Sequence, residues 1–312
     1  MSSNTHYKVS ILIPTYNRLN LFIETMNSII PQVIEKHIHV AIVDDGSTEK
    51  NYEYALELKK NYSFIEVVKH EKNLGLASAK NTLLKLAKGD YLFFFDSDDL
   101  LLPGAVDKIL KLIDSGWADV YVLNTYRQKG KKLKFKFFPE NKKGLELLKA
   151  FLDGCFSEAL YLIKTEKAKQ ILCNPNLKVK EDLAQKACYL LFYKVKVINE
   201  PFAIIRDNPQ RLRNISDYYF THAISAVDDL FNRLPQEYQV LKPFALGKTY
   251  FDLAKMAYRN GLVHEAERFL KEAKTIFPQL KFDIKYLKLK IKLSWAKYLK
   301  LWKQYRSVNM KL

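Results

Sequence analysis

Apolar and polar residues in the first hundred positions alternate between two periods. Short β-branched or aromatic runs are separated by stretches in which apolar residues recur every three or four positions, as on one face of a helix. This pattern predicts strands over Val9–Pro14, His39–Val43, Phe64–Val68 and Tyr91–Phe95, and helices over Leu21–Ile30, Tyr52–Lys60 and Leu76–Ala87, with Pro31 directly after the first helix. Such alternation favours right-handed crossovers and a mostly parallel sheet covered on both faces. We therefore expect an α/β fold.

A β-hairpin is predicted next, from the runs Ala118–Asn124 and Leu133–Phe138, which a basic turn joins. In the second run, lysines alternate with Leu133, Phe135 and Phe137. Two interpretations stay open. The lysines protect the edge of the sheet from pairing with another chain, or they form a basic lip that attracts phosphate-bearing molecules to a nearby site.

From about Ile215 onward the strand signals end and helical ones continue. The segment Leu253–Pro278 matches the tetratricopeptide spacing at Leu253, Ala254, Gly261, Ala266, Ala273 and Pro278. Because one unit is visible, we expect a single helical hairpin packed on the first domain rather than a peptide-binding array.

The last segment carries an apolar, aromatic-rich stripe between lysines. Its members are Ile284, Leu287, Ile291, Trp295, Tyr298, Trp302 and Tyr305. Such a basic amphipathic helix can lie in a membrane interface, where anionic lipid attracts lysine and Trp and Tyr lie at the headgroup level. The alternative is a terminal helix packed on the protein. We favour peripheral membrane contact.

Composition narrows the class of protein. The 312 residues are 48% hydrophobic and carry a formal charge of +17, which allows a full core and about two domains. The positive charge is concentrated in Arg127–Lys143 and Lys281–Leu312, so a uniformly basic nucleic-acid binder is a poor description. Three cysteines without C-x-x-C spacing indicate free thiols in a reducing compartment. Neither a signal sequence nor a spanning helix is predicted.

Three polar clusters follow predicted strands: PTYNR after the first, DDGS after the second and DSDD after the fourth. The carboxyl ends of parallel strands meet at one edge of a sheet, where ligands bind. One such cluster is more typical of a turn or a helix N-cap, but three at one edge favour a site. Asp96, Asp98 and Asp99 repel each other unless a cation lies nearby. Oxygen ligands without His or Cys suit Mg²⁺ or Mn²⁺, and phosphates of a substrate can fill the open positions of that ion.

The motifs VSILIPTYNR, IVDDGSTEK, NLGLASAKN and FFFDSDD, in this order and spacing, resemble those of family 2 glycosyltransferases with the GT-A fold. The resemblance covers about Lys8 to Asp207. It implies a GT-A (Rossmann-like, mostly parallel sheet) domain, followed here by a C-terminal α-helical domain. The activity that it implies is transfer of a sugar from a nucleotide diphosphate, here a UDP-sugar donor, to a saccharide acceptor with inversion.

The resemblance also assigns roles to residues of this chain. It places Pro14, Thr15, Tyr16 and Arg18 at the nucleotide pocket, with Asp45 accepting a hydrogen bond from the uracil imide. Lys80, where the family usually has arginine, and Ser97 would lie near the nucleotide-sugar, Asp96 would meet the ribose, and Asp98 would hold Mn²⁺ or Mg²⁺. Asp99 would either join them or cap the following helix.

The acceptor hydroxyl must lose its proton, and the family resemblance places the base in a Glu-Asp pair. VKEDLAQKA offers Asp182 as the first candidate and Glu181 as the second. Alone, such a pair more often stabilises a helix N-terminus. Where relatives often have a histidine, this chain has Arg206, Arg211 and Arg213, which could clamp phosphate or simply be solvated.

These predictions combine into a domain layout and a cellular role. We expect a transferase domain over residues 1–213, a helical domain over 214–280 and a tail helix over 281–312. The layout is similar to bacterial enzymes that extend lipid-linked saccharides, such as branching glucosyltransferases of N-glycan assembly, at the inner face of the cytoplasmic membrane. Transfer to lipooligosaccharide or capsule is the close competitor. A catalytically inactive adaptor of the same fold is the alternative, and nucleic acid is not expected as a partner.

Overall fold

The computed structural model describes residues 6–48, 50–207 and 217–309. The chain forms two compact units, residues 1–211 and 212–312. The predicted boundary after residue 213, together with Arg211, Arg213 and Ile215, lies outside the described residues.

Unit 1 is built on a sheet of nine strands, counted over the described residues, in the order β3-β2-β1-β4-β8-β6-β9-β5, with β7 paired to β6. β3, β2, β1 and β4 are mutually parallel. β8 is antiparallel to both β4 and β6, so β6 runs in the same direction as β4. The strands are β1 Tyr7–Thr15, β2 Ile38–Asp44, β3 Ile65–Lys69, β4 Gly89–Phe94, β5 Leu100–Leu101, β6 Val120–Lys129, β7 Lys132–Lys134, β8 Leu160–Lys164 and β9 Val195–Ile205.

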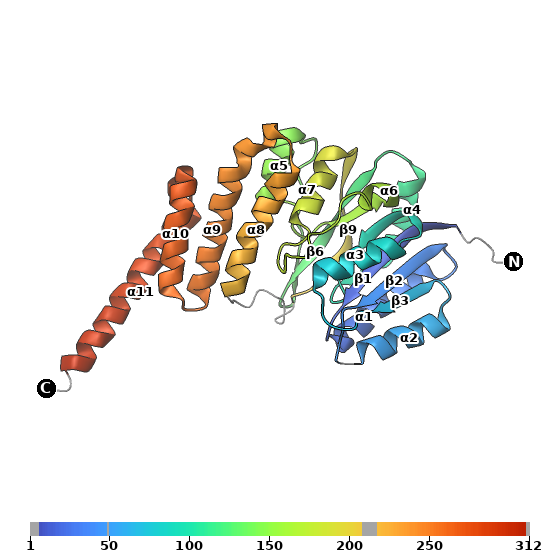
Figure 1. The fold of residues 1–312 in the computed structure, drawn as a ribbon, viewed down its shortest axis with the longest axis horizontal. Helices are drawn as coiled ribbons and strands as arrows, with labels where there is room; N and C mark the ends of the chain where they lie inside the picture. Colours follow the sequence, from blue (N-terminus) through green and yellow to red (C-terminus); the bar gives the residue numbers. More distant parts are fainter. Residues whose placement is uncertain (1–5, 49, 208–216, 310–312) are drawn as a thin grey trace. The chain divides into compact units, whose positions relative to one another are not determined.

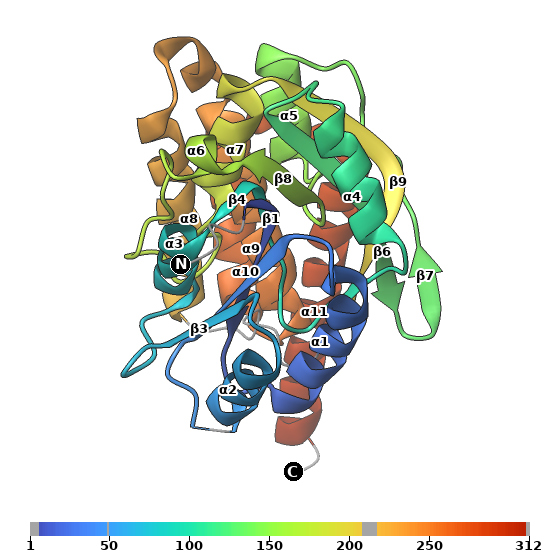
Figure 2. The ribbon, with the colours of Figure 1, turned by 90° about the vertical axis from the view of Figure 1, so that its right-hand side faces the viewer.

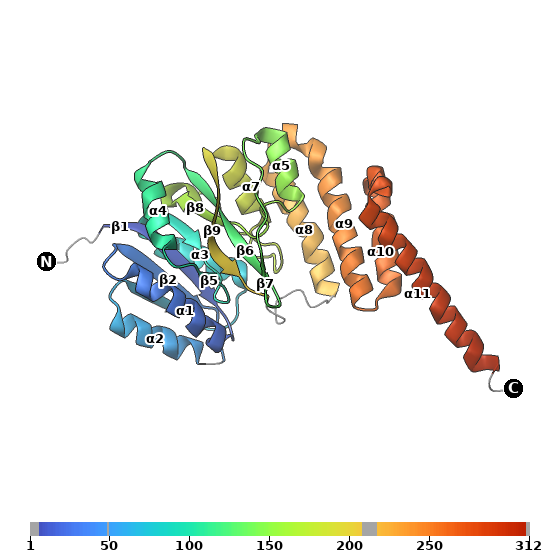
Figure 3. The same ribbon diagram turned by 180° about the vertical axis from the view of Figure 1, so that it is seen from behind.

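Helices cover both faces of this sheet (Figures 1 and 3). The helices are α1 Leu19–Val33, α2 Asn51–Asn61, α3 Leu76–Leu86, α4 Ala105–Asp114, α5 Gly144–Leu152, α6 Thr165–Ala168 and α7 Leu183–Phe192. α1, α2 and α4 share one apolar core with Val9, Ile11 and Ile13 of β1. α3 buries Ala79 and Leu83 on the opposite face. All seven elements predicted for the first hundred positions are confirmed, and with them the α/β class.

One predicted helix boundary was wrong. α1 does not end before Pro31 but continues through it to Val33. Proline removes one backbone donor, yet Val33 is only 1% exposed and belongs to the core of unit 1. Burial of that side chain favours the extra residues.

The predicted hairpin is confirmed, but its turn is shorter and lies further along the chain, and its second strand, β7, ends at Lys134 rather than at Phe138. β6 runs past Asn124 to Lys129, and Lys129 pairs with Lys132 around Gly130, whose φ is +57°. β6 also pairs with β9, as far as Arg127 opposite Ile205. Pairing with β9 therefore extends β6 through Arg127, which the sequence pattern predicted to lie in the turn.

Unit 2 is helical over its described residues, as predicted. Its elements are α8 Asp217–Arg233, the 3₁₀ helix η1 Gln236–Leu241, α9 Lys242–Arg259, α10 Val263–Ile276, the 3₁₀ helix η2 Pro278–Phe282 and α11 Ile284–Asn309. α9 and α10 pack as the expected helical hairpin around Gly261. They fit closely, because a Cβ on Gly247 would lie 2.5 Å from Cβ of Phe277.

The tail helix α11 has two apolar faces. Tyr286, Leu289 and Leu293 are buried, and Tyr286 contacts Phe251 of α9. The predicted stripe is a different face, and its described members are exposed: Ile284, Leu287, Ile291, Trp295 and Tyr298. The side chains of Trp302 and Tyr305 lie outside the described residues. Across the described chain, no helix combines the length and apolarity needed to cross a membrane.

Candidate functional site

The three polar clusters meet at one edge of the sheet, as predicted. β1, β2 and β4 are parallel neighbours, and Thr15 at the end of β1 pairs with Asp44 at the end of β2. PTYNR, DDGS and DSDD therefore follow strands that end on the same side (Figure 1).

The DSDD segment forms a compact group of carboxylates. Asp96, Asp98 and Asp99 each offer an oxygen within 4.8 Å of the others. Asp98 and Asp99 are buried and Asp96 is exposed. The guanidinium of Arg18 lies 3.1 Å from Asp98. The hydroxyl of Ser97 is buried with no hydrogen-bond partner. Three converging carboxylate oxygens fit the donor set that Mg²⁺ and Mn²⁺ prefer.

Arg206 fastens this segment to the rest of unit 1. Its backbone N–H donates to Asp99 at 2.8 Å, its Nε to the carbonyl of Asp98, and its terminal nitrogens to Glu24 and to the carbonyl of Leu21. The suggestion that Arg206 is merely solvated was therefore wrong. So was helix capping by Asp99, because Gly104 is the N-cap of α4 and no side chain caps that helix end.

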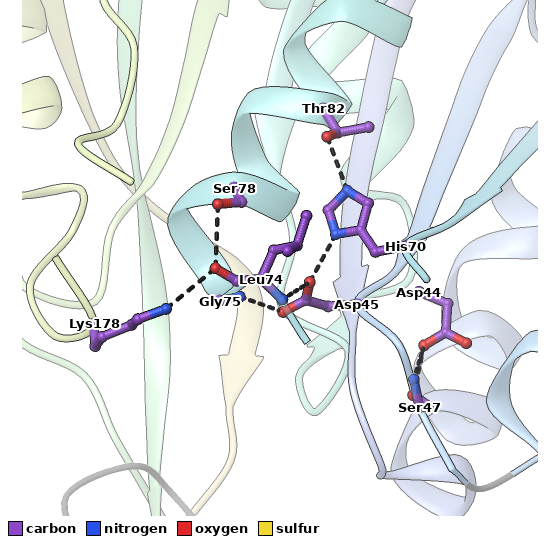
Figure 4. A network of polar contacts seen from close by, with 9 residues as sticks. All are labelled: Asp44, Asp45, Ser47, His70, Leu74, Gly75, Ser78, Thr82 and Lys178. Atoms are coloured by element: carbon purple, nitrogen blue, oxygen red, sulfur yellow. Dashed lines mark hydrogen bonds and ion pairs between the residues drawn. The ribbon is translucent and has the colours of Figure 1, made fainter. Parts of the chain in front are cut away.

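Asp45 is held by a network at the end of β2 (Figure 4). Its carboxylate accepts hydrogen bonds from His70 Nδ1 at 2.7 Å, from the Leu74 N–H at 3.0 Å and from the Gly75 N–H at 2.8 Å. His70 also contacts Thr82 of α3 at 3.0 Å. A carboxylate has about four acceptor positions, so about one remains for a ligand. Sequence reasoning missed His70, which stands in no motif.

Lys80 lies between the two carboxylates of the Glu-Asp pair. Its ammonium is 2.7 Å from Glu181 and 2.8 Å from Asp182, and Lys186 lies 2.8 Å from the same oxygen of Asp182. Burial alone would raise the pKa of Asp182, but the ammonium groups of Lys186 and Lys80 outweigh it and hold that pKa well below its usual range. Burial would likewise lower the pKa of Lys80, but Asp182, Glu181 and, more weakly, Asp96 raise it. Both groups are charged at neutral pH.

The fold thus pairs Lys80 with Glu181 and Asp182 and leaves it close enough to Asp96 for that carboxylate to raise the pKa of Lys80 as well. Asp182 is at the N-cap position of α7, although its side chain makes no cap hydrogen bond. Pro14 and Thr15 are buried within β1, and the Thr15 hydroxyl accepts a hydrogen bond from Asn51 at 2.8 Å. Tyr16 is 38% exposed, so of these three side chains it is the one most accessible to a ligand.

Known proteins share sequence and fold with this chain. A model described as "Glycosyl transferase family 2" matches residues 10–166. The Bacillus subtilis putative teichuronic acid biosynthesis glycosyltransferase TuaG is 32% identical over 179 residues, which cover 56% of this chain and 69% of TuaG. The first curated relatives are matched over only 15–17% of their own length.

Two solved structures have a similar fold. S. aureus TarS residues 1–349 in complex with UDP-GlcNAc has a TM-score of 0.63 at 18% identity, over 88% of this chain and 91% of that one. The mannosyltransferase PcManGT from Pyrobaculum calidifontis, in complex with GDP-Man and Mn²⁺, has a TM-score of 0.56 at 16% identity, over 98% and 84%. At these identities the likeness concerns the fold alone, and it confirms the GT-A type of α/β fold.

Proposed function

The chain belongs to glycosyl transferase family 2, and from this premise we propose that it transfers a hexose from a UDP-sugar to a saccharide acceptor with inversion. The observation that carries the proposal is the arrangement at one sheet edge. Three carboxylates lie within 4.8 Å of one another, and Lys80 connects their surroundings to a second, ionised carboxylate pair. Donor binding and proton removal need these two kinds of group.

The donor half uses the ends of β1, β2 and β4. We assign the uracil to the remaining acceptor position of Asp45, the ribose to Asp96 and a Mn²⁺ or Mg²⁺ ion to Asp98. Tyr16, Arg18, Ser97 and the backbone of Pro14 and Thr15 would complete the pocket. A bound divalent ion would offset the negative charge that grows on the departing diphosphate. The UDP-GlcNAc in TarS and the Mn²⁺ in PcManGT support this assignment.

The base half uses Asp182, with Glu181 as second candidate. The depressed pKa keeps Asp182 ionised at neutral pH, the state in which it can accept the proton of an acceptor hydroxyl. The same two lysines that depress the pKa also weaken the carboxylate as a base. We therefore expect proton transfer to be faster when Lys80 or Lys186 moves away from Asp182 Oδ2 as the acceptor binds.

We place the reaction at the inner face of the cytoplasmic membrane, with a lipid-linked saccharide of cell-surface or N-glycan assembly as acceptor. Support comes from α11, whose exposed stripe of Ile284, Leu287, Ile291, Trp295 and Tyr298 lies among lysines while its other apolar face is packed. Large exposed apolar patches on soluble proteins mark interaction sites, and lysine adds attraction to anionic lipid.

Release of UDP from a panel of UDP-sugars by the full chain tests the proposal. Release should occur with Mn²⁺ or Mg²⁺, increase when a lipid-linked saccharide is supplied, and fall to background with EDTA. A correctly folded protein that releases no UDP from any donor, with or without the lipid-linked saccharide, would refute transfer and favour the inactive adaptor.

A further inference from the structure

The end of β6, the turn, β7 and the three residues after β7 form a short basic segment, residues Lys129–Phe137, here called the basic hairpin. Because β6 runs parallel to β4 through their common neighbour β8, the carboxyl end of β6 lies at the same edge of the sheet as the DSDD segment. Figure 2 shows the hairpin projecting from the sheet. The basic hairpin therefore extends from the edge that holds the candidate site.

Its charge is positive and uncompensated. Lys129, Lys131, Lys132, Lys134 and Lys136 are all exposed, and none of the ion pairs among the described residues involves them. Lysines this close together repel one another. A bound anion would relieve that repulsion.

The basic hairpin also presents an aromatic surface. Phe135 contacts Tyr126 at 5.5 Å and Phe137 at 5.2 Å between ring centroids. Phe137 is 71% exposed. Exposed lysines can protect the edge of a sheet, but edge protection does not account for an exposed phenylalanine that contacts a second ring. Aromatic faces offer flat apolar surface, against which the C–H faces of sugar rings can pack.

We propose that the basic hairpin binds the acceptor, and that this acceptor is a glycan with phosphate groups in its chain. The lysines would contact the phosphates and Phe137 a neighbouring sugar ring. This inference rests on the proposed function, since it names the acceptor of that reaction. A membrane surface is less favoured as the occupant, because the exposed stripe that suits lipid lies on α11 instead.

Binding of a phosphorylated mannan, and of the same mannan after removal of its phosphate, tests the inference on the full chain. We expect the phosphorylated form to bind more tightly, with an affinity that falls as salt is added. Lys131→Ser, Lys132→Ser and Lys134→Ser together should weaken its binding about tenfold, as expected for three exposed ionic contacts. Phe137→Ala should weaken binding of the phosphorylated mannan but not of inorganic polyphosphate.

The tail helix supplies a matched control. Lys288→Ser, Lys290→Ser and Lys292→Ser remove the same charge from exposed positions of α11, and this variant should keep its affinity for the phosphorylated mannan. Equal losses in both variants would show non-specific attraction and overturn the inference. The inference would also be overturned if the hairpin variant lost as much affinity for anionic vesicles or for a single-stranded RNA as for the phosphorylated mannan. UDP release without acceptor should be normal in the hairpin variant, which separates failure of this inference from failure of sugar transfer.

Discussion

Replacing Lys80 by methionine probes the connection between the two halves of the site. The substitution keeps an unbranched apolar side chain but removes an ammonium that lies 2.7 Å from Glu181 and 2.8 Å from Asp182. The Lys80 and Glu181 side chains are only 6% and 9% exposed, so water cannot replace the lost partner. Breaking a buried ion pair from one side costs about 3–5 kcal/mol. Because Lys186 still pairs with Asp182, we expect Lys80→Met to lower the free energy of unfolding by about 3 kcal/mol, the lower end of that range.

Thermal unfolding followed by circular dichroism at pH 7 measures this loss. In a unit of this size, 1 kcal/mol corresponds to about 2–4 °C, so Lys80→Met should lower Tm by roughly 6–12 °C. The pH matters because the stability that comes from the depressed pKa of Asp182 is complete only above the pKa of the unfolded chain, near 3.9. That contribution is complete at pH 7 and is lost as the pH falls through the folded pKa.

Two further variants separate charge from packing. Lys80→Arg keeps the charge and should retain most of the stability. Lys80→Met combined with Glu181→Gln removes the orphaned carboxylate and should recover part of the lost Tm. A Tm for Lys80→Met within about 2 °C of the parent, or no recovery in the double variant, would show that the ion pairs do not hold the site together.

Asp98→Ala should abolish metal-stimulated UDP release, whereas Asp107→Ala, at an exposed surface carboxylate, should not; equal activity in both would remove the metal role. Asp182→Asn should leave donor binding nearly intact but lower turnover by roughly a hundredfold or more, and a normal rate would exclude it as the base. Ile291→Ser with Trp295→Ser should release the protein from anionic vesicles, while Val240→Ser, which is 68% exposed in the same unit, should not; unchanged partitioning would refute the tail contact. Burial and, next, Lys88 lower the pKa of His39 to about 4, so the unfolded chain takes up a proton first and unit 1 should lose up to about 3 kcal/mol between pH 6.5 and 4. Urea unfolding should show this loss in the parent but not in His39→Gln. The same dependence of the free energy of unfolding on pH in both proteins would contradict it.

The fold was readable from sequence because its signals are local. Each strand and helix of the first hundred residues carries its own apolar period, and the acidic motifs stand directly behind strands. The tail stripe was also readable as a helical face. The exposure of this stripe could not be predicted. Tyr286, Leu289 and Leu293 form a second apolar face on the same helix, and the spacing of apolar residues does not indicate which of the two faces is buried.

Long-range pairing within the site was not readable. Lys80 meets Glu181 and Asp182 across 101 and 102 positions, and no local pattern specifies that distance. His70 lies at the end of a strand without a motif. Arg206 was noticed only because a histidine was expected there, and its role depends on the approach of β9 to the DSDD segment. Residue types indicated the chemistry, but the tertiary fold determines which charges meet.

The Arg206 contacts also have a consequence for biosynthesis. Asp99 accepts a hydrogen bond from Arg206, which follows it by 107 positions in the sequence. A nascent chain emerges from its N-terminus first, so Asp99 is synthesised well before its partner. The strands β1 to β4 can assemble while the DSDD segment still lacks its contacts with Arg206. The arrangement of these carboxylates is then completed only late in translation, and a fragment cut to residues 10–166 would keep β2, β3 and β4 but would lack the contact between Asp99 and Arg206.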